Sequence, residues 1–356
     1  MHTQYKYAIP LPIRKGDQLM VKCIDTKGEV LEIGYNTHAG GLDVAQGYGY
    51  AGYHIIQSLQ KMGYETPFNS ATAPVQLNFT QPYYYQFHPN QYIIGYTPWE
   101  STKLHDGWKE SMNMCNEVWT TSDWCAKVFE DEGVEKPIFI YPHGIDHEWT
   151  PEKRIVTRKI RFLHFGEPAV RKGGQLAFDA FTELFGNDPK YHLTIKANGP
   201  STIRAKNISG EIASPTQQYN NVSIVKKMLD LPELISLIKD HHAMIYPSFG
   251  EGFGFIPLQG LASGMPVIFN TTWAPYRKFS MGLDVSDKLI DSPWQELHPG
   301  KVLQPSKESI KENMIELVEN YDKYAEQAFK NAPAIHKEYD WTKVTTKAFR
   351  ALEKRL

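Results

Sequence analysis

The sequence is short of cysteine and of long apolar runs. Its 356 residues include three cysteines, Cys23, Cys115 and Cys125, an odd number without metal-binding or redox spacing. We therefore expect a reduced protein without a disulfide framework. No apolar run approaches the length of a membrane span, and residues 1–15 are polar and proline-containing where a signal peptide needs an apolar core. Together these features predict a cytoplasmic protein.

An excess of charge of either sign is also lacking. Lysine and arginine number 38 against 40 aspartates and glutamates, which excludes the basic imbalance typical of nucleic-acid-binding proteins. The charge is unevenly distributed, however. Residues 1–150 hold ten basic and seventeen acidic side chains, a net charge of −7, whereas the remainder holds 28 and 23, a net charge of +5. A polyanion would therefore find little attraction in the first half.

What the sequence does contain is a regular alternation of strand-length apolar runs with helical patterns. This alternation indicates α/β architecture with parallel sheets covered on both faces. At about 150 residues per domain the chain should form two domains. Polar residues 150–159 are the natural linker, and helical spacing near the C-terminus predicts a final helix from Trp341 to Leu356. We expect strands at 30–35, 75–79, 91–97, 117–121, 137–141, 160–166, 191–197, 222–225, 243–246 and 266–270, and helices at 52–62, 122–132, 175–185, 232–239 and 257–263.

The most specific stretch runs from Pro247 to Gly260, PSFGEGFGFIPLQG. It is typical of a strand that leaves the sheet through a glycine-rich turn into a helix, with Pro257 near the first helical turn. Glycines let backbone N–H groups approach an anion closely, and a helix N-terminus attracts it. The stretch therefore predicts a phosphate cradle, formed by Gly252, Phe253, Gly254 and Phe255.

Two polar side chains of this stretch are candidate ligand contacts. Glu251, at the mouth of the turn, could accept hydrogen bonds from sugar hydroxyls, and Gln259, two helical turns on, would face the same way. A plain strand-to-helix turn with a solvated glutamate is the structural alternative.

A second stretch, Phe165 to Gly174, also follows an expected strand and opens a helix. Its adjacent cations, Arg171 and Lys172, could neutralise a diphosphate, the arginine by forking onto two oxygens and the lysine as a compact charge. A solvated pair of surface cations is the structural alternative.

These stretches resemble the retaining nucleotide-sugar glycosyltransferases of family 4. In that family two carboxylates with seven residues between them span the glycine turn. Glu251 matches the first, which contacts the donor sugar, and Gln259 stands at the second, which binds the ribose hydroxyls. The amide still donates and accepts, but a charge-assisted hydrogen bond is lost.

The resemblance extends to three other places. Gly166 and Lys172-Gly173 match the spacing of the family's phosphate-binding loop, but Glu167 replaces its arginine, so that arginine's role passes to Arg171. Residues 142–146, Pro-His-Gly-Ile-Asp, match the segment that closes the first domain, and residues 339–341, Tyr-Asp-Trp, match the segment that returns to it.

The resemblance implies the GT-B fold, with two facing Rossmann-like domains and a C-terminal helix crossing back to the first. Residues 1–149 with 336–356 would form the acceptor-side domain, and residues 150–335 the nucleotide-sugar domain. Because the sequence contains no Asp-x-Asp, we expect no metal cofactor, with the diphosphate charge met by Arg171, Lys172 and backbone N–H groups.

The acceptor side is less defined. Trp99 and Glu100 follow an expected buried strand, and similar proteins, several encoded by bacteriophages, carry a Trp-Glu pair here. Trp99 could stack on a sugar or base, although a core role is at least as compatible with the pattern. Glu100 could hold the acceptor hydroxyl, since a carboxylate after a central strand is costly unless used.

Another glycine-rich segment leaves alternatives open. Residues 47–52, GYGYAG, fit the GxGxxG pattern of a nicotinamide enzyme, but the preceding strand ends too early for that fingerprint. In the resembling family such a loop faces the donor phosphates, as would Gly40-Gly41, and a flexible loop with packed tyrosines is an equal alternative. His241-His242 we interpret as structural, because no carboxylate or cysteine lies at ligand spacing.

The sequence thus predicts a retaining transferase that moves a sugar from a nucleoside diphosphate sugar to an acceptor hydroxyl. The phage-like resemblance suggests hydroxymethylated DNA bases or a glycan or protein as acceptor, in the host cytoplasm for a phage enzyme, and the acidic first half disfavours DNA. A non-catalytic sugar-nucleotide-binding protein and a dehydrogenase are the alternatives from other functional classes.

Overall fold

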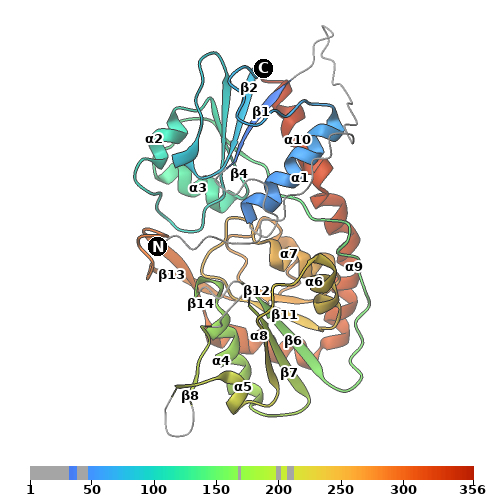
Figure 1. The fold of residues 1–356 in the computed structure, drawn as a ribbon. Helices are drawn as coiled ribbons and strands as arrows, with labels where there is room; N and C mark the ends of the chain where they lie inside the picture. Colours follow the sequence, from blue (N-terminus) through green and yellow to red (C-terminus); the bar gives the residue numbers. More distant parts are fainter. Residues whose placement is uncertain (1–31, 38–46, 167–169, 198–201, 207–211) are drawn as a thin grey trace. The chain divides into compact units, whose positions relative to one another are not determined.

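The computed structural model describes residues 32–37, 47–166, 170–197, 202–206 and 212–356, which divide into two compact units. The first contains the described residues up to Trp99, then Leu104–Gly144 and Tyr339–Leu356 (Figure 1). The second contains Glu100–Lys103 and Ile145–Glu338. The domain changes predicted at residues 149 and 336 lie instead at residues 144 and 339, and residues 100–103, predicted in the first domain, belong to the second unit.

The first unit is built on a parallel sheet with helices around it. Neighbouring strands follow the chain order β1-β2-β3-β4-β5 and all pair in parallel. The final helix returns to this unit and packs along its first helix. The elements are β1 (Ile33–Thr37), α1 (Gly47–Met62), β2 (Val75–Phe79), η1 (Pro82–Tyr84), β3 (Tyr92–Tyr96), α2 (Trp108–Asn113), β4 (Glu117–Thr120), α3 (Asp123–Asp131), β5 (Ile138–Ile140) and α10 (Trp341–Glu353).

The second unit contains a doubly wound sheet, in which the strand order reverses between β6 and β11. Its main sheet is parallel with the strand order β10-β7-β6-β11-β12, so that β6 and β11 are neighbours although about 80 residues separate them. The elements are β6 (Ile160–Phe165), η2 (Val170–Lys172), α4 (Gly174–Phe185), β7 (Tyr191–Lys196), β8 (Ala205–Lys206), β9 (Ile212–Ala213), α5 (Pro215–Gln218), β10 (Val222–Val225), α6 (Leu231–Lys239), β11 (Ala243–Tyr246), α7 (Phe255–Ala262), β12 (Val267–Phe269), η3 (Arg277–Phe279), β13 (Asp287–Asp291), β14 (Lys301–Pro305), α8 (Lys307–Glu319) and α9 (Tyr321–Tyr339).

Local sequence signals explain several element ends. The Ser122 side chain accepts a hydrogen bond from the Cys125 backbone N–H and caps α3. Asp230 and Glu233 form a reciprocal capping box at α6. Strands such as β11 (AMIY) are buried along their whole length, as their continuous apolar sequence predicts. None of the described helices combines the length and apolar character that a membrane crossing requires.

Two helix starts differ from the sequence prediction. Helix α1 begins at Gly47 rather than Gly52, so residues 47–52 form its first turns and not a loop. A dinucleotide fingerprint needs these glycines in the turn between strand and helix, so residues 47–52 do not fit that fingerprint and are not themselves a phosphate-facing loop. The other candidate for that loop, Gly40-Gly41, lies outside the described residues. Helix α7 begins at Phe255 rather than Pro257. Sequence reasoning missed both starts because glycine and residues before proline disfavour helix.

The linker predicted at residues 150–159 has no helix or strand, but it is anchored to the second unit. Arg154 is buried, and its guanidinium donates to the backbone oxygens of His241 (2.9 Å) and Ser263 (2.6 Å). The segment is therefore a fixed part of the second unit.

An ion pair ties the end of the chain to the first sheet. Glu117 on β4 is 1% exposed, and Arg355 donates to both of its carboxylate oxygens at 2.7 and 2.9 Å. Tyr92 and Trp119 donate to the same carboxylate, which therefore accepts hydrogen bonds from three side chains. The two-point contact of the Arg355 guanidinium with this buried carboxylate anchors the end of the chain to the sheet.

Arg355→Ala should destabilise the first unit by about 2–4 kcal/mol, because it leaves a buried charge without its cation. Lys127→Ala, which removes an exposed ion pair with Asp131 in the same unit, should cost less than about 1 kcal/mol. Urea denaturation of both variants measures the difference, and equal stabilities would show that the Glu117 pair contributes no more than a surface pair.

Candidate functional site

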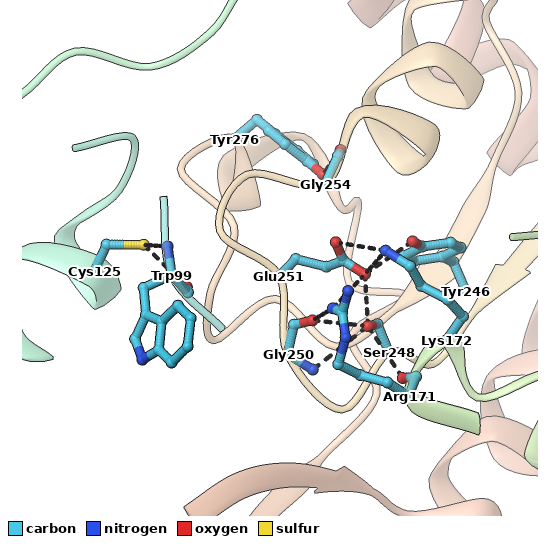
Figure 2. Close-up of polar contacts among 10 residues, drawn as sticks. All are labelled: Trp99, Cys125, Arg171, Lys172, Tyr246, Ser248, Gly250, Glu251, Gly254 and Tyr276. Atoms are coloured by element: carbon cyan, nitrogen blue, oxygen red, sulfur yellow. Dashed lines mark hydrogen bonds and ion pairs between the residues drawn. The ribbon is translucent and has the colours of Figure 1, made fainter. Parts of the chain in front are cut away.

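The candidate site lies where β6 and β11 end at the same edge of the second sheet. The chain after β6 passes through η2, which carries Arg171 and Lys172, and the chain after β11 forms the glycine-rich turn, which carries Glu251. Adjacent parallel strands place their following loops side by side. The two stretches that the sequence singled out therefore converge, as Figure 2 shows.

Glu251 is the centre of the hydrogen-bond network. Lys172 Nζ donates to its Oε1 at 2.8 Å and to its Oε2 at 3.0 Å, and Arg171 Nη1 lies 3.5 Å from Oε1. Tyr246 and Ser248 donate their hydroxyl groups to Oε1 at 2.9 and 2.7 Å (Figure 2). The structure thus places both predicted cations on the predicted carboxylate, which excludes the alternatives of a solvated glutamate and a solvated cation pair.

The network keeps this buried carboxyl ionised. Burial by itself would raise the pKa of Glu251, but the charges of Lys172 and Arg171 and the hydrogen bonds outweigh it and lower the pKa to about 2. At neutral pH the site therefore contains two cations and one anion, a net positive charge suited to an anionic ligand.

This pKa shift makes stability depend on pH. The folded-state pKa lies below the ordinary value of 4.5, so the stabilisation is present above pH 4.5 and is lost as the pH falls toward about 2. We expect the free-energy advantage of the native protein over Glu251→Gln, about 3 kcal/mol at pH 6, to shrink steadily over that interval. Unfolding curves of both proteins from pH 6 to pH 2.5 test this, and a constant difference would contradict it.

Backbone contacts fix the glycine-rich turn. The Phe249 N–H donates to Arg171 O and Phe249 O accepts from the Leu303 N–H on β14, both at 2.8 Å, and the Arg171 guanidinium donates to Gly250 O. Gly173 has a φ of +73°, and a Cβ there would collide with Pro247 O. The loop after β6 and the turn after β11 can approach this closely only because Gly173 has no side chain.

Gly254 is the other position that demands glycine. It is the left-handed N-cap of α7 with a φ of +80°, and a Cβ would meet the ring of Trp273 and the hydroxyl oxygen of Tyr276. Tyr276 also donates its hydroxyl to Gly254 O. These buried rings set the path by which the turn enters the helix.

Gly254→Ala should destabilise the second unit far more than Gly282→Ala. Both glycines have a φ of +80°, but nothing lies within 4 Å of a Cβ at Gly282. We expect about 1 kcal/mol for Gly282→Ala, from backbone strain alone, and about 3 kcal/mol or more for Gly254→Ala, because rigid rings must also shift. Thermal unfolding separates the two, and similar losses would contradict the packing at Gly254.

The other predicted donor-side residues lie in or beside this turn. Gly252 and Phe253 are buried, Phe253 packs on Tyr276, and Phe255 is half-buried. A Cβ at Gly166 would lie 3.1 Å from Lys172 Cβ, so Gly166 lets the lysine fold back over the end of β6. Gly40, Gly41 and Glu167 lie outside the described residues.

Gln259 does not stand in the predicted relation to Glu251. It is half-buried on α7, whereas Glu251 precedes the first residue of that helix. The spacing of two helical turns therefore does not place the two side chains on one face.

The two acceptor-side candidates are placed differently from the prediction. Trp99 is 3% exposed, packs on Trp108 with ring centroids 4.5 Å apart, and exchanges backbone contacts with Cys125 Sγ (Figure 2). This burial supports the core role and leaves no ring face for an acceptor in this structure. Glu100 belongs to the second unit, where its backbone carbonyl lies against Gly250, and not to the first.

His241 and His143 are buried structural residues whose ring nitrogens hydrogen-bond to groups outside the Glu251 network. His241 is buried, with its ring nitrogens on Leu237 O and the Thr194 hydroxyl, and burial lowers its pKa to about 4. His143 is buried in the first unit and hydrogen-bonds to Tyr96. No group of three or more histidine, cysteine or acidic side chains suited to a metal occurs in the described part of the chain.

Sequence reasoning missed Tyr246 and Ser248. Tyr246 ends a buried strand and is 1% exposed, so its pattern is that of a core residue, and Ser248 is fully buried in the turn. Their hydroxyl groups are paired with Glu251, and only the fold reveals this partner.

Comparison with known proteins gives one family match. The model of a family described as "Family 4 Glycosyltransferase in conflict systems" matches residues 121–347, which include both converging stretches. No curated protein sequence matches the chain.

Solved structures show the fold. Sucrose-phosphate synthase from Thermosynechococcus elongatus superposes with a TM-score of 0.65 at 12% identity, covering 91% of this chain and 98% of that one. HepE from Anabaena, in complex with UDP-glucose, superposes with a TM-score of 0.59 at 12% identity, covering 91% of this chain and 99% of that one. WaaG, a glycosyltransferase involved in lipopolysaccharide biosynthesis, superposes with a TM-score of 0.55 at 12% identity, covering 89% of this chain and 98% of that one. The two Rossmann-like units therefore form a GT-B fold.

Proposed function

The chain belongs to the family 4 glycosyltransferases of conflict systems, and on that premise we propose that it transfers a sugar from a nucleoside diphosphate sugar to an acceptor hydroxyl with retention of configuration. The convergence of Arg171, Lys172 and Glu251 at the carboxyl edge of the second sheet supports the donor half of this proposal. This edge is where doubly wound sheets bind nucleotides.

In the proposed reaction the cations stabilise the leaving group. As the bond between the sugar and the diphosphate breaks, negative charge grows on the phosphate oxygens, and Lys172 and Arg171 would neutralise it. The helix α7, which begins directly after the turn, would contribute the positive end of its dipole. We propose that this charge compensation requires no metal ion.

Glu251 would bind the sugar. A carboxylate that stays ionised accepts strong hydrogen bonds from sugar hydroxyls, and Glu251 lies beside the cations that would hold the diphosphate. Gln259 would contact the ribose through its amide. For retention, the departing phosphate would take the acceptor proton on the face it leaves, so no protein side chain need act as the base.

For the acceptor we propose a hydroxyl on a glycan or protein ahead of one on DNA. The acceptor-side domain, residues 1–149 with 336–356, has a net charge of −4, which disfavours a polyanion. A phage origin, with hydroxymethylated DNA bases as substrate, is the competing proposal. A gel-shift titration with duplex DNA at 50 and 200 mM salt distinguishes the two, since salt-sensitive binding would favour DNA.

A thermal-shift screen against UDP-, GDP- and ADP-sugars tests donor binding. A ligand that binds the folded state alone raises the melting temperature by mass action, so we expect one nucleotide class to stabilise the protein. Nicotinamide dinucleotides serve as the negative control. The absence of a shift with every sugar nucleotide would contradict the proposal.

A second candidate, a sugar-nucleotide-binding protein without turnover, is favoured by one observation. Gln259 stands where the family has a carboxylate, so the family's motif is incomplete, although an amide can still hydrogen-bond to the ribose. This candidate predicts stabilisation by the sugar nucleotide without release of free nucleoside diphosphate.

A further inference from the structure

The two oxygens of the Glu251 carboxylate have different surroundings. Oε1 accepts from Tyr246, Ser248 and Lys172 and has Arg171 3.5 Å away. Oε2 accepts from Lys172 at 3.0 Å, its one donor among the described residues. Oε1 is therefore saturated by protein groups, and Oε2 depends on the lysine alone.

The proposed function requires Lys172 to bind the diphosphate of the donor. Its ammonium group has three donors, and two point at the carboxylate in this structure. When the lysine turns toward phosphate oxygens, Oε2 loses its partner and is open to a hydroxyl group. Oε1 keeps the two neutral donors, because neither hydroxyl bears a charge that a phosphate would attract.

Both neutral donors are rigidly placed. Tyr246 is the last residue of β11 and is 1% exposed. Its ring stacks on that of His164 of β6, with the ring centroids 6.3 Å apart. Ser248 is fully buried in the turn, and its hydroxyl oxygen also lies 3.4 Å from the Gly250 N–H. Burial and the nearby carboxylate raise the pKa of Tyr246 well above its ordinary value, so the phenol stays a donor.

We propose that Tyr246 and Ser248 are positioning residues that hold Oε1 of Glu251, so that Oε2 accepts a donor-sugar hydroxyl once Lys172 moves to the diphosphate. The inference rests on the proposed function and adds to it the atom that contacts the sugar and the groups that aim it. Without these hydroxyl groups the Glu251 carboxylate would rotate with the Lys172 ammonium group and lose its orientation toward the sugar.

The test compares nucleoside diphosphate with sugar nucleotide in Tyr246→Phe and Ser248→Ala. The candidate probe pairs are UDP with UDP-glucose, GDP with GDP-mannose, and ADP with ADP-glucose. The pair that the native protein binds is used for the variants. Titration calorimetry gives both affinities, and donor hydrolysis gives kcat and KM. Each variant should bind the diphosphate within about two-fold of the native protein, whereas sugar-nucleotide affinity and kcat should fall about ten-fold, the effect of one lost hydrogen bond to a charge.

Tyr324→Phe is the matched control. It removes a tyrosine hydroxyl that donates to a carboxylate, Glu316 Oε1 at 3.0 Å, in the same unit but away from the site. This variant should behave as the native protein in both titrations. Melting temperatures recorded alongside show that each variant is folded.

Two outcomes would overturn the inference. Native sugar-nucleotide affinity and kcat in Tyr246→Phe and Ser248→Ala would show that Oε1 needs no such support. Equal losses for diphosphate and sugar nucleotide would show that the hydroxyl groups merely maintain the site. If the native protein binds no probe at all, the proposed function itself fails, which is a different result from either.

Discussion

Replacing Arg171 and Lys172 together by alanine should lower the rate of sugar transfer by about 10⁴-fold or more. Each cation is expected to stabilise the charge that grows on the departing diphosphate, and one such donor or charge contributes about 10²–10³ in rate. The structure adds a reason for treating them as a unit, since both lie on the same carboxylate. Steady-state kinetics with the donor identified by thermal shift measures the loss.

Lys307→Ala with Lys311→Ala is the matched control for this variant. Those two lysines also pair with a single carboxylate, Glu183, in the same unit, but at a distance from the site along the chain and on another helix. The control should keep native activity.

Loss of both site cations leaves Glu251 buried without a counter-charge, which could unfold the double variant. The triple variant Arg171→Ala/Lys172→Ala/Glu251→Gln removes that charge and is therefore measured beside it. This folded variant should also fail to bind the nucleoside diphosphate, and native binding by it would contradict the phosphate role.

Glu251→Gln should have opposite effects on binding and on turnover. The substitution frees Lys172 and Arg171 from their anionic partner, so affinity for the nucleoside diphosphate should be unchanged or rise several-fold. Turnover should fall by about 10²-fold, because the amide accepts a weaker hydrogen bond from the sugar than the carboxylate does. Calorimetry with the diphosphate and kinetics with the sugar nucleotide measure the two effects.

This pair of effects distinguishes the proposed role from a structural one. A Glu251 that only maintained the turn would lose diphosphate affinity and turnover together. Unchanged turnover in a folded Glu251→Gln protein would contradict its role in sugar binding.

The residues of the candidate site could be singled out from the sequence because they lie in short local patterns. Glycine-rich turns after apolar strands mark the carboxyl edge of a parallel sheet, and Lys172 and Glu251 lie in two such turns. What sequence could not give was their direct contact, which depends on β6 and β11 being neighbours in the sheet. The cations consequently lie on Glu251, an ion pair that the sequence did not predict.

Residues outside local patterns escaped prediction. Tyr246 satisfies the apolar pattern of a buried strand, so nothing in the sequence distinguishes its hydroxyl from that of a core tyrosine. Arg355 and Glu117 are separated by 238 residues and meet only because the last helix returns to the first unit. Helix α1 includes Gly47 and Gly49 because its packing face outweighs the low helix propensity of glycine.

Release of free nucleoside diphosphate from a sugar nucleotide tests the central claim most directly. Native protein and Arg171→Ala/Lys172→Ala are incubated with UDP-, GDP- and ADP-sugars, and the diphosphate formed is quantified by chromatography. We predict that the native protein releases the diphosphate from one nucleotide class and the variant does not. Binding of a sugar nucleotide by the native protein without any release would contradict the account, and would identify a binding protein in place of a transferase.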